Sequence, residues 1–92
     1  MEVIKLEGDF TTERALAHKE SLNKLAREYS DITIDARNVN NTDIVGVNAI
    51  ATTQKILADK GGSLIVKLNK DGELYRLLHL TKFSTIIRMQ LQ

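Results

Sequence analysis

A strand, a helix and a second strand follow one another between residues 31 and 68, and this succession most constrains the fold of the chain. Residues 31–36 (DITIDA) alternate polar and apolar side chains, which indicates a strand with one buried face. Apolar residues then recur at helical spacing over residues 47–58, and Gly61-Gly62 ends that helix. Residues 64–68 (LIVKL) form an almost continuous apolar run, typical of a central strand covered on both faces. The region therefore predicts a β-α-β unit with a right-handed crossover.

The rest of the chain continues this alternation of strands and helices. Residues 2–6 predict a first strand, which Gly8-Asp9 would end. A helix with one apolar stripe follows, and either Thr11 or Thr12 can cap it with a side-chain oxygen. The remaining predicted elements are a helix over residues 73–80 and a strand over residues 85–91. This order predicts a single α/β domain over residues 1–92, with about four strands in a mixed sheet and three helices in a layered fold.

The most polar connection lies inside the β-α-β unit, at residues 37–43 (RNVNNTD). Its three asparagines tolerate left-handed backbone and bond to their own main chain, which predicts a tight loop. Asp43 is expected to be the N-cap of the following helix. Sites in open α/β sheets usually lie where the carboxyl end of a strand meets a helix N-terminus. Binding of a small ligand by residues 38–43 is left open.

Composition and motifs argue against catalysis, metal binding and nucleic-acid binding. Thirteen basic and twelve acidic side chains form no basic patch, and four aromatic residues offer few stacking platforms. Cysteine is absent, and His18 and His79 lack the fixed spacing of metal ligands. Asp35 and Asp43 lie eight residues apart, which guarantees no geometry for acid–base work. We expect a protein that is not an enzyme and that has no cofactor, no metal and no nucleic-acid partner.

The expected location is the cytoplasm. The first residues lack the basic segment and long apolar core of a signal peptide. No run approaches the roughly 18 apolar residues of a membrane span, so no direct membrane insertion is expected. The absence of cysteine fits a reducing compartment.

Five short stretches of the chain have the form of sequence motifs. Each motif is degenerate by itself, but the order and spacing of the five together are fairly specific. They are residues 6–10 (LEGDF), 32–39 (ITIDARNV), 42–47 (TDIVGV), 60–66 (KGGSLIV) and 73–81 (ELYRLLHLT). Together they resemble the STAS domain family, which takes its name from sulphate transporters and anti-sigma-factor antagonists. The resemblance covers nearly the whole chain and implies a STAS-like layered α/β fold.

The resemblance also implies a function, which is partner binding without catalysis. The chain would be a bacterial, anti-sigma-factor-antagonist-like regulator that binds a kinase-type anti-sigma factor or a similar protein. The implied contact surface is the turn at residues 41–48 together with the following helix; its residues are Asn41, Thr42, Asp43, Ile44, Val45, Gly46, Val47 and Asn48. The alternative is a soluble cytoplasmic subunit of a membrane complex that transports lipids or anions. A homodimer is also left open.

One position departs from the family pattern. The regulatory phosphoserine of the family matches Val45, and the serine before it matches Ile44. A valine has no hydroxyl group, so phosphate could not regulate binding at this position. Thr42 is the nearest hydroxyl and the candidate substitute for phosphorylation, although a turn residue that bonds to main chain is its simpler role. If Ile44 and Val45 are exposed, they favour a constitutive contact, and if they are buried, they belong to the core.

Overall fold

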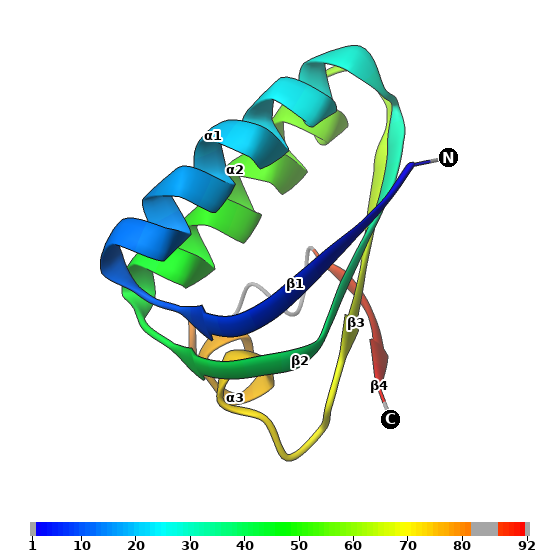
Figure 1. Ribbon diagram of the computed structural model, residues 1–92. Coiled ribbons are helices and arrows are strands. Elements are labelled where there is room, and N and C mark those ends of the chain that lie inside the picture. The colour runs from blue at the N-terminus through cyan, green and yellow to red at the C-terminus, as the bar shows by residue number, and fades with distance from the viewer. Residues whose placement is uncertain (1, 82–86, 92) are drawn as a thin grey trace.

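The computed structural model describes residues 2–81 and 87–91 of the 92-residue chain. Its elements are β1 (Glu2–Phe10), α1 (Thr12–Glu28), β2 (Asp31–Thr42), α2 (Ile44–Asp59), β3 (Ser63–Leu68), α3 (Glu73–Leu80) and β4 (Arg88–Leu91) (Figure 1). The predicted alternation of four strands and three helices is therefore confirmed. The predicted last strand began at residue 85, and its first two residues lie outside the described ranges.

The four described strands form one sheet in the order β1-β2-β3-β4, and every neighbouring pair is parallel. The prediction of a mixed sheet is wrong for these strands. β1 connects to β2 through α1, β2 to β3 through α2, and β3 to β4 by way of α3. A helical crossover returns the chain to the starting end of the sheet, so successive strands run in the same direction.

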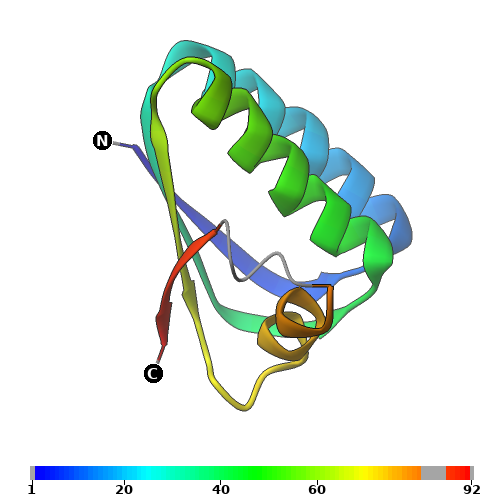
Figure 2. The ribbon, with the colours of Figure 1, turned by 180° about the vertical axis from the view of Figure 1, so that it is seen from behind.

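All three helices lie on the same face of the sheet, with α1 and α2 side by side and α3 near the ends of β2 and β3 (Figures 1 and 2). Right-handed crossovers that always step toward the same edge produce this arrangement. No described element covers the opposite face. In β3 the side chains therefore alternate between buried Leu64, Val66 and Leu68 and half-buried Ser63, Ile65 and Lys67. The prediction that residues 64–68 are covered on both faces is wrong.

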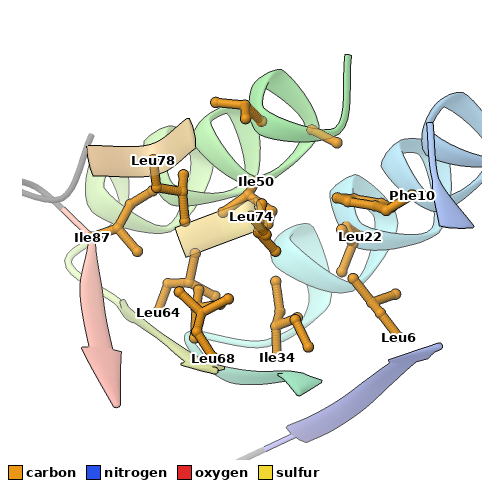
Figure 3. Close-up of a cluster of buried hydrophobic side chains, with 14 of the residues drawn as sticks. Leu6, Phe10, Leu22, Ile34, Ile50, Leu64, Leu68, Leu74, Leu78 and Ile87 are labelled. Carbon is orange, nitrogen blue, oxygen red and sulfur yellow. The ribbon is translucent and has the colours of Figure 1, made fainter. Parts of the chain in front are cut away.

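The hydrophobic core fills the space between the sheet and the three helices (Figure 3). The sheet contributes Leu6, Phe10, Ile34, Leu64 and Leu68, and the helices contribute Leu22, Ile50, Leu74 and Leu78. Each of these side chains is at most 3% exposed. Full burial of a side chain of this size contributes roughly 1.5–3 kcal/mol, so this layer holds the helices on the sheet.

β1 and β2 are both longer than their sequence patterns predict. β1 continues through Gly8-Asp9 to Phe10, with register shifts between Lys5 and Glu7 and between Gly8 and Phe10. Gly8 has φ +74°, a left-handed conformation that glycine adopts without strain. The tight loop predicted at residues 37–43 is also wrong, because β2 stays extended up to Thr42 and pairs with β1. Pairing with the neighbouring strand outweighs the local turn preference of the asparagines.

Candidate functional site

Residues 41–48 connect the end of β2 to the start of α2, and we call this segment the corner. It lies beside the end of β1 and the start of α1, so two strand ends and two helix N-termini meet there (Figure 1). The side-chain amide of Asn41 donates a 3.0 Å hydrogen bond to Asp9 Oδ1, which joins β2 to β1 at this end. The expected meeting of a strand's carboxyl end with a helix N-terminus is thus present.

Asp43 caps the N-termini of both α1 and α2. Its Oδ1 atom accepts hydrogen bonds from the backbone N–H groups of Val45 (3.0 Å) and Gly46 (3.2 Å), which confirms the predicted N-cap of α2. Its Oδ2 atom accepts from the backbone N–H of Thr12 (3.1 Å) and from the hydroxyl of Thr12 (3.2 Å). Thr11 occupies the N-cap position of α1, but its side chain makes no capping bond among the described residues. The prediction that a threonine oxygen caps α1 is therefore wrong.

These hydrogen bonds keep Asp43 ionised. Partial removal from water raises the pKa of Asp43, but the hydrogen bonds from Thr12, Gly46 and Val45 together outweigh it and lower the pKa below its ordinary value. A carboxylate at a helix N-terminus also interacts favourably with the positive end of the helix dipole. Here one carboxylate accepts hydrogen bonds from the N-termini of two helices, so the relative placement of α1 and α2 depends on it.

Gly46 sets how closely α2 approaches β1. A Cβ atom on Gly46 would lie 2.5 Å from the carbonyl oxygen of Phe10 and 2.8 Å from its ring. Real Cβ atoms do not approach backbone oxygens this closely, so only glycine fits this position without a shift. The first turn of α2 is therefore packed directly on the end of β1.

The eight predicted contact residues differ in how far they are exposed to solvent. Asn41, Ile44 and Asn48 are exposed, Asp43 and Val45 are half-buried, and Thr42, Gly46 and Val47 are buried. Ile44 is 55% exposed, whereas Val45 packs partly against the core. The apolar surface of the corner is therefore mainly the side chain of Ile44.

Thr42 is only 4% exposed, and its hydroxyl oxygen has no hydrogen-bond partner among the described residues. A kinase would need the end of β2 to move before it could reach this hydroxyl. Phosphorylation of Thr42 stays a prediction, and so does the correspondence of Val45 with the family's phosphoserine.

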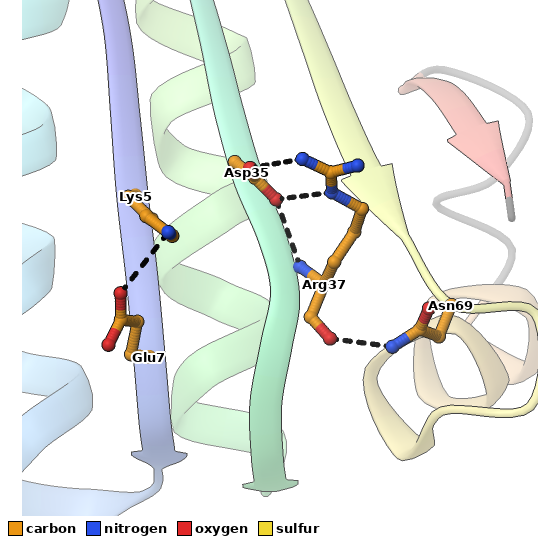
Figure 4. A network of polar contacts seen from close by, with 5 residues as sticks. All are labelled: Lys5, Glu7, Asp35, Arg37 and Asn69. Atoms are coloured by element: carbon orange, nitrogen blue, oxygen red, sulfur yellow. Dashed lines mark hydrogen bonds and ion pairs between the residues drawn. The ribbon is translucent and has the colours of Figure 1, made fainter.

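A second polar cluster lies on β2, near the start of the segment that leads to α3 (Figure 4). Asp35 accepts hydrogen bonds from Arg37 Nε at 2.9 Å and from the terminal Nη2 atom at 2.7 Å. The side-chain amide of Asn69 donates to the carbonyl oxygen of Arg37. Residues two apart on a strand share one face, so the D-x-R pattern could have revealed this ion pair from the sequence. Sequence reasoning missed it.

Neither Asp35 nor Asp43 has the electrostatics of a general acid or base. The hydrogen bonds and charge of Arg37 hold the pKa of Asp35 well below its ordinary range. Catalytic carboxylates that act near neutral pH need the opposite shift. In the structure, Asp35 instead holds the side chain of Arg37, and Asp43 holds the first backbone N–H groups of α1 and α2.

The histidines lie against aromatic rings instead of other potential metal ligands. The ring centroid of His18 is 5.7 Å from that of Phe10, and the centroid of His79 is 6.1 Å from that of Tyr75. Over residues 2–81 and 87–91, no group of three or more His, Cys, Asp or Glu side chains is arranged to hold a metal ion. In the same ranges, no helix combines the length and the apolar character that crossing a membrane requires.

The fold is similar to that of a solved anti-sigma factor antagonist. The solved structure of the anti-sigma factor antagonist SpoIIAA in its unphosphorylated form matches with a TM-score of 0.72 and 17% sequence identity, over 96% of this chain and 76% of that chain. At this identity the likeness concerns the fold alone. The family model described as "Mlab, STAS domain" matches residues 2–89. The chain therefore belongs to the STAS domain family, which confirms the resemblance found in the sequence. No curated protein matches the chain.

Proposed function

We propose that this chain is a non-catalytic interaction domain that binds a partner protein through the exposed residues of the corner and the adjoining part of α2. Its role would be that of an anti-sigma-factor-antagonist-like regulator in the cytoplasm. Membership of the STAS family and the fold shared with the antagonist SpoIIAA support a regulatory role. The electrostatics of Asp35 and Asp43 give no support to catalysis.

The observation that carries the proposal is the exposure of Ile44 on a rigid support. Asp43 accepts hydrogen bonds from the backbone of Val45 and Gly46 inside the corner and of Thr12 in α1. Gly46 also packs on Phe10, so the backbone around Ile44 is held in place. A large apolar side chain that is 55% exposed on such a support presents a preformed contact and loses little entropy on binding. Because Ile44 and Val45 carry no hydroxyl group, binding here would not be reversed by phosphorylation of these two residues.

The test is capture of partner proteins from an extract of the source cells, with the wild-type chain, Ile44→Asp and Leu16→Asp as matched baits. Leu16 is on α1, is 52% exposed and provides the same apolar-to-acidic change outside residues 41–48. We expect Ile44→Asp to reduce recovery of the partner at least about tenfold, as loss of an apolar anchor does at an interface centre. Leu16→Asp should recover the partner as well as the wild type does.

The pattern of recovery decides the proposal. Equal recovery with wild type and Ile44→Asp would show that the corner is not the docking surface. The nature of the protein recovered separates the two partner classes. A soluble kinase-like protein would support the regulator, and a membrane protein would support the transport-complex subunit.

A further inference from the structure

The outward face of α2 carries a stripe of mostly small or uncharged side chains that begins at the corner. Ile44, Asn48, Ala51, Lys55 and Ala58 follow one another at intervals of 4, 3, 4 and 3 residues. At about 100° per residue, these positions fall within about 80° of one another around the helix. Ala51 is half-buried and the other four are exposed. This is the spacing with which one helix contacts another in a coiled coil.

A shallow groove of about 800 Å³ follows this stripe. It is lined by Lys19 of α1 and by side chains of α2 between Asn48 and Ala58. α1 and α2 lie side by side on the sheet (Figure 2). The lining residues therefore place the groove along α2, on the side next to Lys19 of α1. Ala51 and Ala58 have short side chains, so the backbone of another helix could approach α2 closely at these positions.

The ionisable side chains that line the groove are both cationic. They are Lys19 and Lys55, and neither forms an ion pair with a carboxylate in the described part of the chain. Asp59 is one turn beyond Lys55, at the end of α2, and is not part of the lining. Complementary charge at an interface speeds association and selects the partner, so this groove favours an acidic occupant.

We propose that the partner docks an acidic amphipathic helix into this groove, an inference that rests on the function proposed above. Such a helix would need about 15 residues to run from Ile44 to Ala58, at 1.5 Å per residue. Small apolar side chains would meet Ala51 and Ala58, and Glu or Asp side chains would meet Lys19 and Lys55. A second copy of the chain is a poorer occupant, because it would bring two sets of these lysines together.

The probes for this inference are two synthetic helical peptides of about 18 residues with the same seam of Leu and Ala. One peptide carries Glu at the positions that flank the seam, and the other carries Lys. Fluorescence anisotropy measures the binding of each peptide to the purified chain. We expect the acidic peptide to bind wild type at least about tenfold more tightly than the basic one.

Two substitutions change the groove, and each has a matched control on α1. Ala51→Arg fills the groove and Lys55→Glu reverses its charge, so each should weaken the acidic peptide about tenfold. Ala17→Arg and Lys24→Glu make the same chemical changes at exposed positions outside the groove and should leave binding unchanged. Arginine favours helix about as well as alanine does, so Ala51→Arg should keep its circular dichroism spectrum and Tm.

Three results of the peptide experiments would overturn the inference. They are absence of binding by both peptides, equal binding of both peptides, and normal binding of the acidic peptide to Ala51→Arg. A wild-type dimer in light scattering that Ala51→Arg dissociates would assign the groove to a second copy and would also overturn it. Capture of the cellular partner by two variants distinguishes failure of this inference from failure of the proposed function. Loss of capture with Ile44→Asp but full capture with Ala58→Arg would keep the corner as the docking surface and reject a helix in the groove.

Discussion

α1 and α2 are of almost equal length and lie side by side on the same face of the sheet, but they differ in how they begin and in what they expose. α2 begins with its own N-cap, Asp43, whereas the first turn of α1 takes its capping bonds from the same Asp43 side chain, 31 residues away. α1 has charged side chains throughout its length, whereas α2 has only Lys55 and Asp59. The comparison shows that α1 has the outward face of an ordinary solvated helix and that α2 does not.

The largest effect is expected where α2 meets β1. Gly46→Ala should lower Tm by about 15 °C, because the new Cβ would overlap the backbone of Phe10 and outweigh the gain in helix propensity. Arg14 occupies the corresponding third position of α1 and is exposed, so Arg14→Ala should change Tm by less than about 3 °C. Thermal unfolding followed by circular dichroism measures both. Similar changes in Tm for the two variants would contradict the closer packing of the first turn of α2 on β1.

A smaller but more distributed effect is expected from loss of the shared cap. Asp43→Ala should lower Tm by about 10 °C, because two helices lose capping bonds at once. Hydrogen exchange should become faster at the first amides of both α1 and α2. Thr11→Ala is the control and should have little effect, since the Thr11 side chain makes no capping bond in the described structure. Faster exchange in α2 alone would show that Asp43 does not support α1.

The effect of pH should be smaller still, and its sign follows from the lowered pKa of Asp43. A carboxyl group whose pKa is lower in the folded state stabilises the fold fully above its unfolded pKa, which is about 3.9 for Asp. That stabilisation is lost as pH falls from this value through the folded pKa. The difference in Tm between wild type and Asp43→Asn should therefore shrink below about pH 4. A difference in Tm that stays constant down to pH 2 would contradict the lowered pKa of Asp43.

The order of the elements could be predicted from sequence because it depends on local patterns. The alternation in residues 31–36 and the position of Asp43 before the apolar stripe of α2 each need only a short window of sequence. The extension of β2 through its asparagines could not be predicted, because it depends on pairing with β1. The bonds from Thr12 to Asp43 were missed for the same reason, since 31 residues separate the two.

The sequence predicted which segment forms the candidate site but not which of its side chains are exposed. Residues 41–48 were correctly placed at a helix N-terminus, but the exposure of each residue depends on the tertiary contacts of that helix. Ile44 and Val45 are adjacent and similar in sequence, yet one points to solvent and the other packs partly on the core. No pattern in a single sequence separates them.

The most direct test of the central claim, that the partner meets the corner and the groove along α2 and not the charged outward face of α1, is hydrogen exchange of this chain with and without its captured partner. We predict slower exchange on binding at the corner and along α2, with the exchange of α1 unchanged except in its capped first turn. Slower exchange along the charged face of α1, with α2 unchanged, would contradict the account.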